Sequence, residues 1–398
     1  MEVSGRRRIA VKTLIHHARV IADGYREIAC GGVLVENGRI LALFEESEFS
    51  ARVQEDCEII DAQGGMLTPG FIDIHIHGAA GEDLISGKAE AAEAVSRNVA
   101  ADGCTAFMAS LTVVSHAQLL EILSSLAQVK SLPGATMLGI HSEGPYLSPD
   151  YKALMDDRYL RDPSLKELQE MLQAAAGRLK IMTVAPERQG MESFIQAAVQ
   201  SGMTVMVGHT AATSRDVHRA SLAGATGFTH LYNAMSQHLH RDPGTVTGAF
   251  LEEGMKAELI ADGFHVDPEI VRMTWKHMGA QRLVLITDAM LGKGMPDGDF
   301  QFSGLHCRKQ GQHVRVVETG RRAGSAIGMN DAVRMMEQMC GCTPRELVQM
   351  ACVNPAALAQ VSDHKGALAA GMDADLALFD KNWQCQRTMV EGNWVFQR

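Results

Sequence analysis

The sequence lacks several features that would place it in a membrane or secreted class. No run of about 18 apolar residues occurs anywhere in its 398 residues, so we expect no membrane-spanning helix and no membrane partner. The stretch MEVSGRRRIAVKTLIHHARV begins basic, but neither an uninterrupted apolar segment nor a small-residue cleavage site follows it, which disfavours a secretory leader. Long internal repeats and low-complexity segments are missing as well.

Cysteine pairing and excess basic charge are also absent. The eight cysteines are scattered and include no C-x-x-C pair, which disfavours a disulfide framework and a thiolate zinc site. We therefore expect a cytoplasmic protein with reduced thiols. A formal net charge of −10 argues against nucleic acid as the main partner. With 46% hydrophobic and 21% charged residues, the composition is that of a globular protein.

Between residues 70 and 290 the sequence repeats one pattern. Short apolar segments rich in β-formers alternate with longer stretches whose apolar spacing fits helices and whose terminal glycines fit helix stops. The expected strands are residues 71–77, 104–110, 135–143, 179–187, 203–209, 225–230, 256–262 and 282–288. Eight strands alternating with helices predict an α/β fold of the (β/α)₈ barrel type.

Both ends of the chain have a different pattern. Residues 11–66 and 366–398 contain short apolar segments punctuated by Gly and Asn-Gly, as hairpins require. We therefore predict a small β-sandwich domain formed by residues 1–66 together with 366–398. The barrel is expected to occupy residues 67–365.

The segment PGFIDIHIHG, residues 69–78, places His75 and His77 two positions apart at the end of the first expected strand. Alternate residues of a strand share one face, so both imidazoles point the same way. Each could simply be a polar strand-end residue bonded to a neighbour. Neutral imidazole is, however, the commonest biological ligand for zinc-like ions, and Gly78 allows a close turn.

Polar residues also end most of the other expected strands. In a (β/α)₈ barrel the carboxyl ends of the strands form one mouth, where catalytic groups lie. The imidazoles and carboxylates that we expect to converge there are His75, His77, Glu143, His209, His230 and Asp288. This donor set suits a divalent zinc, iron, manganese or cobalt ion and predicts hydrolysis assisted by a metal and a carboxylate.

Seven segments in this order carry a family resemblance over nearly the whole chain. They are GMLTPGFIDIHIHG, HSEGPY (141–146), VGHT (207–210), THLYNAM (229–235), IADGFHVD (260–267), LITDA (285–289) and DADLALFD (373–380). HxH alone is shared by many hydrolases, whereas EGP, THLYNAM and ADGFH together are specific. The chain resembles the N-acetylglucosamine-6-phosphate deacetylases of the amidohydrolase superfamily.

The resemblance implies roles for individual residues. Glu143, His209 and His230 match the main metal ligands, and Asp288 matches the catalytic acid and base. Because His75 and His77 are present, it implies one or two divalent ions per subunit, with zinc or iron expected and manganese or cobalt as alternatives. The positions that match substrate contacts are Asn233, Ala234, Arg241, His265, Ile327, Gly328 and Met329. Arg241 and His265 are implied to reach the neighbouring subunit's substrate, and therefore a homodimer.

Two segments depart from the family pattern. Relatives carry a Lys-Gly-Ala-His-like stretch after EGP, whereas here Leu154 and Met155 follow Ala153, and Met155 cannot donate the hydrogen bond of the missing histidine. AGSAIGMN likewise replaces a Ser-Thr/Leu-Thr-Met pattern. Both changes affect substrate recognition rather than metal binding.

Three functions are consistent with these residues. The first is hydrolysis of the N-acetyl amide of N-acetylglucosamine 6-phosphate, giving glucosamine 6-phosphate and acetate. The second keeps the barrel and metal but takes N-acetylgalactosamine 6-phosphate or another N-acyl compound. The third is an inactive binding protein on the same fold, because fold alone does not establish activity.

Overall fold

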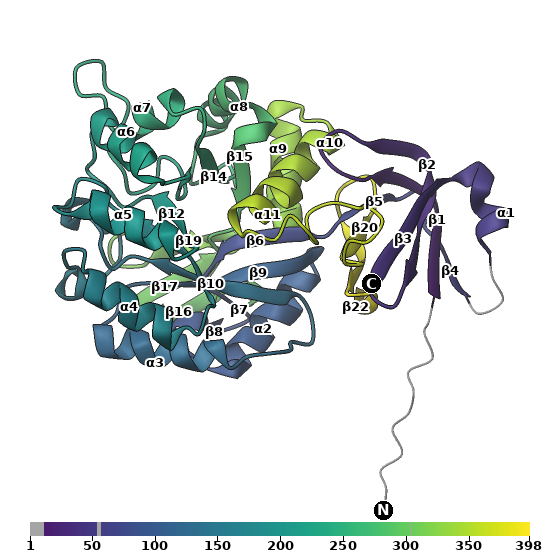
Figure 1. Ribbon diagram of the computed structural model, residues 1–398, viewed down its shortest axis with the longest axis horizontal. Helices are drawn as coiled ribbons and strands as arrows, with labels where there is room; N and C mark the ends of the chain where they lie inside the picture. The colour runs from purple at the N-terminus through teal and green to yellow at the C-terminus, as the bar shows by residue number, and fades with distance from the viewer. Residues whose placement is uncertain (1–11, 54–56, 303) are drawn as a thin grey trace, which may run out of the picture.

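A barrel of parallel strands forms the larger part of the protein (Figure 1). The computed structural model describes residues 12–53, 57–302 and 304–398. Within these residues the barrel sheet has eight strands, one at each of the eight expected segments, and only β9 runs past its segment, by one residue. They are β6 (Phe71–Ile76), β9 (Cys104–Leu111), β10 (Thr136–Glu143), β11 (Leu179–Val184), β12 (Thr204–Val207), β13 (Gly227–Phe228), β14 (Lys256–Ile260) and β15 (Leu283–Ile286). The expected (β/α)₈ barrel is confirmed.

The barrel closes between its first and last strands. The Asp288 amide donates to the His75 carbonyl at 2.9 Å, and the His77 amide donates to the Ala289 carbonyl at 2.8 Å. Because these bonds lie just beyond β15 and at the end of β6, closure itself places His75, His77 and Asp288 side by side.

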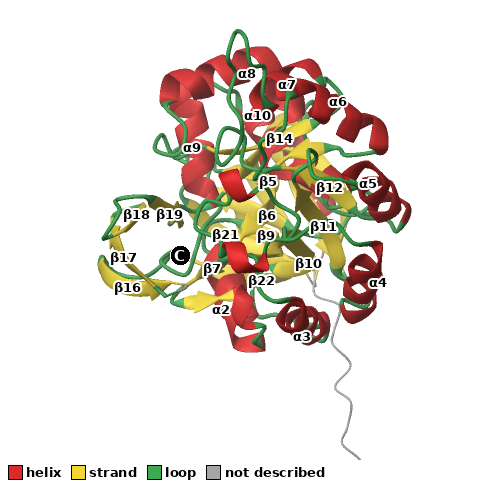
Figure 2. Ribbon diagram, turned by 90° about the vertical axis from the view of Figure 1, so that its left-hand side faces the viewer, coloured by secondary structure: helices red, strands yellow, loops and turns green. Residues whose placement is uncertain are grey.

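Helices surround the barrel sheet (Figure 2). They are α2 (Ala89–Ala100), α3 (His116–Ala127), α4 (Leu165–Ala174), α5 (Met191–Gln200), α6 (Ser214–Ala223), α7 (Thr245–Leu251), α8 (Pro268–Arg282), α9 (Met329–Cys340), α10 (Pro344–Val348) and α11 (Asn354–Leu358). Their sequences explain both the buried face and the ends. In α2, for example, Ala92, Val95 and Val99 are buried at helical spacing, and α6 begins with the capping box of Thr213 and Asp216. None of the described helices is long and apolar enough to cross a membrane.

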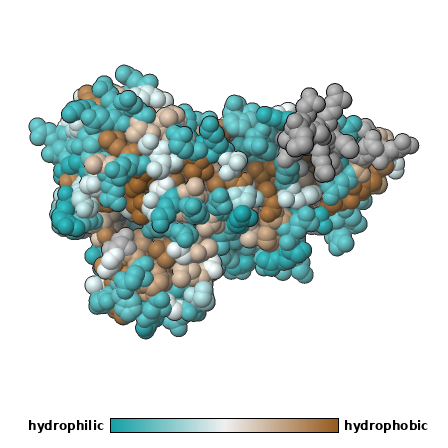
Figure 3. All heavy atoms as spheres, turned by 90° about the horizontal axis from the view of Figure 1, so that it is seen from below, coloured by the Kyte–Doolittle hydropathy of each residue, from teal (hydrophilic) through white to brown (hydrophobic). Residues whose placement is uncertain are grey.

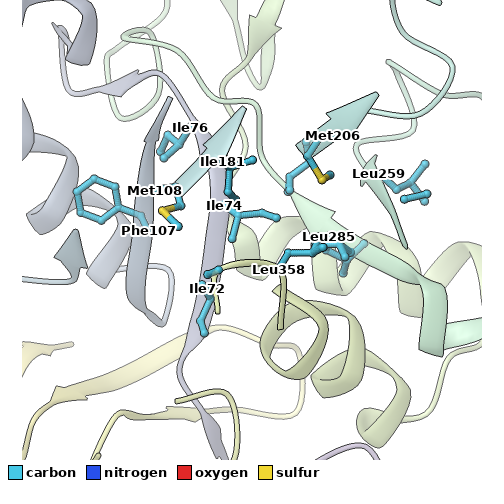
Figure 4. Packing of buried hydrophobic residues seen from close by; sticks show 14 of the residues in the cluster. Ile72, Ile74, Ile76, Phe107, Met108, Ile181, Met206, Leu259, Leu285 and Leu358 are labelled. Atoms are coloured by element: carbon cyan, nitrogen blue, oxygen red, sulfur yellow. The ribbon is translucent and has the colours of Figure 1, made fainter. Parts of the chain in front are cut away.

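Strand β6 separates apolar from polar side chains. Ile72, Ile74 and Ile76 pack in the main hydrophobic core, where Figure 4 shows them among residues of neighbouring elements. The residues between and after them, Asp73, His75 and His77, lie on the other face, because strand side chains alternate. The buried imidazoles of His75 and His77 therefore point away from the isoleucines.

Both ends of the chain build a separate mixed sheet, as expected. Its path runs β22 (Asn393–Gln397), β21 (Cys385–Val390), β20 (Leu376–Phe379), β5 (Met66–Pro69), β1 (Lys12–Ile21), β2 (Glu27–Glu36) and β3 (Arg39–Glu45), and β4 (Cys57–Asp61) pairs with β1. A short helix, α1 (Phe49–Arg52), lies beside it (Figure 1). Strand β5 leads directly into β6, so this sheet fixes where the first barrel strand starts.

A further sheet follows the last barrel strand, and the sequence did not lead us to expect it. It consists of β16 (Gly298–Phe302), β17 (Leu305–Gln310), β18 (His313–Val316) and β19 (Arg322–Ser325), and it stands out to one side of the barrel in Figure 2. A two-stranded ribbon, β7 (Gly78–Ala79) and β8 (Glu82–Asp83), lies next to β6 in sequence. The face drawn in Figure 3 is largely hydrophilic, with apolar residues gathered toward its middle.

Candidate metal centre and substrate pocket

One carboxylate and two imidazoles meet at the carboxyl ends of three barrel strands. Glu143 is the last residue of β10, His209 follows β12 and His230 follows β13. The Nε2 atoms of both histidines lie 2.9 Å from Glu143 Oε1 and 3.1 Å from each other. All three side chains are buried. The expected convergence of this set is therefore present in the structure.

His75, His77 and Asp288 form an adjoining group. His77 Nε2 lies 3.3 Å from Asp288 Oδ1 and 3.2 Å from His75 Nε2. The two groups share Glu143, because its Oε2 is 3.4 Å from His77 Nε2 while its Oε1 contacts the other pair. Glu143 thus lies between two places where ligand atoms gather.

The backbone at the strand ends aims these side chains inward. His209, His230 and Asp288 have positive φ angles of 49°, 30° and 47°. Such angles are uncommon for residues with a Cβ, and they cluster at functional sites where the surrounding structure holds them.

Partners behind the ligand atoms set the orientation of the imidazoles. His75 Nδ1 lies 3.0 Å from Glu258 Oε2, and His209 Nδ1 lies 2.8 Å from the Tyr151 carbonyl. A histidine whose Nδ1 proton goes to an oxygen presents Nε2 as a lone pair. Glu258 is fully buried on β14 and also accepts the His230 amide at 3.1 Å.

The electrostatics of the cluster favour carboxylate anions and added positive charge. Burial opposes ionisation of Glu143, but the charges of His209 and His75 and the hydrogen bonds of His209 and His230 hold its pKa well below the usual range. Burial likewise opposes ionisation of Asp288, but the hydrogen bond from His77 and the neighbouring imidazoles lower its pKa to about 2. Both carboxylates are therefore anions at neutral pH.

The donor set fits a divalent cation. Glu143, His209 and His230 offer ligand atoms that all lie within 4.8 Å of one another, and so do His75, His77 and Asp288. Two imidazole Nε2 atoms 3.1 Å apart repel unless a proton or a cation lies between them, and a carboxylate beside them completes a nitrogen and oxygen ligand set. The chemistry of these residues is that of a metal site with room for one or two ions.

A cavity of about 540 Å³ opens over this cluster. Glu143, His209, His230, His77 and Asp288 line one part of it. Its volume lies in the range of small-molecule sites. The cluster is thus accessible to a ligand of the size of a sugar phosphate.

Most of the expected substrate residues also line this cavity. Asn233, Ala234, Leu154, Met155 and His265 are among the lining residues. His265 belongs to the pocket of its own chain, where its Nδ1 lies 2.6 Å from Asp262 Oδ2.

Four other expected substrate residues lie elsewhere. Arg241 is exposed on the loop between β13 and α7 and is not among the lining residues. Ile327, Gly328 and Met329 are buried beside the start of α9 and do not line the cavity either.

The structure adds three residues that the sequence reading did not single out. Arg322, the first residue of β19, and Arg321 before it line the cavity, and Glu258 lies behind His75. A charged residue inside the apolar segment KAELI was a usable signal for Glu258, because buried carboxylates need partners. The two arginines had no such signal, since they belong to a sheet that was not expected.

Comparisons with known proteins agree with this geometry. The model of the Amidohydrolase family matches residues 66–395. N-acetylglucosamine-6-phosphate deacetylase from Bacillus subtilis (strain 168) is 31% identical over 391 residues, 96% of this chain and 95% of that protein. N-acetylgalactosamine-6-phosphate deacetylase from Escherichia coli O157:H7 is 32% identical over 336 residues, 84% and 89% of the two chains.

A solved structure is similar over the full length. It is a mutant N-acetyl-D-glucosamine-6-phosphate deacetylase from Mycobacterium smegmatis in complex with N-acetyl-D-glucosamine-6-phosphate. The TM-score is 0.88 at 31% sequence identity, and the match covers 98% of this chain and 100% of that one.

Proposed function

This chain belongs to the amidohydrolase family, and on that premise we propose that it hydrolyses the N-acetyl amide of N-acetyl-D-glucosamine 6-phosphate. The products are D-glucosamine 6-phosphate and acetate. The observation that carries the proposal is the convergence of Glu143, His209 and His230 beside Asp288 in one cavity. An inactive binding protein on this fold would have no need of the complete set.

Asp288 is the proposed acid and base. Its carboxylate is ionised and faces the cavity, so Oδ1 can accept a proton from the attacking water. The same oxygen then returns the proton to the amide nitrogen, which leaves as a neutral amine when the C–N bond breaks. The His77 imidazole, with Nε2 at 3.3 Å from Oδ1, holds the carboxylate in place between these two transfers.

Glu143, His209 and His230 are the residues that would hold a divalent cation. Bound there, the cation would polarise the amide carbonyl and lower the pKa of a water molecule. Nitrogen and carboxylate donors support zinc or iron, with manganese or cobalt as alternatives. His75 and His77, with Asp288, would hold a second ion.

The remaining cavity residues are proposed to bind the sugar phosphate. Asn233 and Ala234 lie beside the metal cluster, and Leu154 and Met155 face the same space from the loop after β10. Ile327, Gly328 and Met329 follow β19 and would support this wall from behind. 

The protein is also proposed to act as a cytoplasmic homodimer. The eight free cysteines support a reducing compartment. Exposed Arg241 lies outside its own pocket, in a loop with Leu239 exposed to 55%, which supports a role against a neighbouring subunit. His265, in contrast, would act within its own chain.

The test is acetate release by metal-reconstituted protein from N-acetylglucosamine 6-phosphate, its galacto epimer and unphosphorylated N-acetylglucosamine. We expect fastest turnover of the gluco 6-phosphate and loss of turnover in Asp288→Asn. Comparable metal content in the variant would show that the loss is chemical. Turnover of none of the three by metal-loaded protein would refute the proposal.

A further inference from the structure

We infer that Arg322, with Arg321 beside it, binds the 6-phosphate of the substrate from within the same chain. This inference rests on the proposed function, which it deepens. Arg322 begins β19 of the four-stranded sheet that stands beside the barrel (Figure 2), Arg321 precedes it, and both residues line the same cavity as the metal cluster. They are the two arginines among the described residues that line this cavity.

The charges of the cavity leave these arginines free for an anion. Its lining carboxylates are Glu143, Asp156 and Asp288. The first and last are engaged in the histidine cluster, and Asp156 is paired with Arg158 at 2.5 Å. Within the described part of the chain, no carboxylate forms an ion pair with Arg321 or Arg322.

Phe264 lies against the Arg322 guanidinium. Arg322 Cζ lies 4.2 Å from the centroid of the Phe264 ring, and Arg315 lies over the same ring at 4.7 Å. Stacking uses the face of the guanidinium and leaves its N–H edges free. Those edges match two phosphate oxygens at once, which an ammonium group cannot do.

The spacing along β19 fits the length of the substrate. The Ser325 amide donates to the Asp288 carbonyl at 2.9 Å, so this end of β19 adjoins the catalytic carboxylate. Gly324 allows that approach, because a Cβ there would lie 3.0 Å from the Asp288 carbonyl oxygen. Arg322 lies three residues earlier, at most about 10 Å away along the chain, because the positive φ of 64° at Gly324 shortens this segment relative to an extended strand. The acetamide and the phosphate are carried on C2 and C6, on opposite sides of the sugar ring, and therefore need recognition groups separated in this way.

The test compares Arg322→Gln with Arg315→Gln, a matched control that stacks on the same ring but does not line the substrate cavity. For N-acetylglucosamine 6-phosphate we expect kcat/KM to fall about 30- to 100-fold in Arg322→Gln, the loss of a charge-assisted bidentate contact. The value for unphosphorylated N-acetylglucosamine should not change. Arg322→Lys should recover part of the loss, and Arg315→Gln should behave as wild type. Arg322 is exposed, so these variants should fold.

Calorimetric binding of D-glucosamine 6-phosphate and of D-glucosamine separates this inference from the proposed function. Tighter binding of the phosphorylated sugar that is lost in Arg322→Gln supports the inference even if wild type hydrolyses neither acetylated sugar. A phosphate preference that survives in the Arg321→Gln/Arg322→Gln double variant overturns it. In that case another positively charged side chain must bind the phosphate, and Arg241 of a second copy becomes the candidate.

Discussion

Replacing Lys365 by Met should destabilise the junction between the sheet of the termini and the barrel. The Lys365 ammonium is 4% exposed and lies 2.5 Å from Asp375 Oδ2 and 2.8 Å from Asp373 Oδ2. Asp373 has a second cation, Arg39, at 2.6 Å, whereas the other bond of Asp375 comes from the Glu391 amide. Loss of Lys365 therefore leaves Asp375 as a buried charge without a countercharge.

Removing one partner of a buried ion pair typically lowers the free energy of unfolding by about 3 to 5 kcal/mol. We expect a decrease of this size for Lys365→Met in urea unfolding followed by tryptophan fluorescence, because Trp383 packs against Phe71 of the barrel and Phe379 of the sheet of the termini. The double variant Lys365→Met/Asp375→Asn also removes the unpaired charge, and its free energy of unfolding should decrease clearly less than that of Lys365→Met. Equal urea midpoints for wild type and Lys365→Met, or a double variant less stable than the single one, would refute this reasoning.

The loss of stability in Lys365→Met should depend on pH in a definite direction. Burial raises the pKa of Asp375, and Lys365 opposes that rise. A carboxyl group whose pKa is higher in the folded than in the unfolded state lowers stability as pH rises from the unfolded value of about 3.9 to the folded value, and the loss is complete above the folded value. Without Lys365 the rise is larger. The gap in stability between wild type and Lys365→Met should thus be wider at pH 8 than at pH 5.

Three further predictions concern the candidate metal centre. Asp288→Asn should lower kcat about 10²- to 10⁴-fold, the usual contribution of a positioned acid and base, measured as acetate release at equal metal content. Glu258→Gln should weaken metal binding at His75 and His77 about 10- to 100-fold. A metal titration in which binding at His209 and His230 falls by the same factor would contradict a role of Glu258 confined to the His75 and His77 site. Metal added at about 100 times its dissociation constant should stabilise the folded protein by about 2.7 kcal/mol, seen as a higher unfolding temperature, and the effect should vanish in Glu143→Gln.

The sequence predicted the barrel well because its strands carry a strong local signal. Each of the eight expected segments is apolar, ends in a polar residue and coincides with one barrel strand, and most are followed by a helix. The histidines and carboxylates at those ends converge for a topological reason, since parallel barrel strands end at one mouth. That argument needs no knowledge of individual contacts.

The four-stranded sheet could not be predicted in the same way. Its strands are short and half exposed, so their apolar periodicity is weak. For example, β18 buries only Val314 and Val316. Nothing in the sequence around Arg321 and Arg322 therefore distinguishes them from surface charges. The position of Arg241 outside the pocket is also set by a loop path, on which residue type carries little information.

The geometry of His75 shows why local sequence cannot fix a site of this kind. Its strand begins at a point set by the sheet of the termini, because the Gly70 amide just before β6 donates to the Asp375 carbonyl at 3.0 Å. Its imidazole is oriented by Glu258, which is 183 residues away in sequence. The HxH pattern therefore specifies which atoms can bind a cation, but their placement depends on two distant carboxyl residues, one acting through its backbone and one through its side chain. Variants at Glu258 should therefore change the orientation of the His75 imidazole without destabilising β6. Variants at Lys365, which is bonded to Asp375, should destabilise the start of β6 without acting on the imidazole directly.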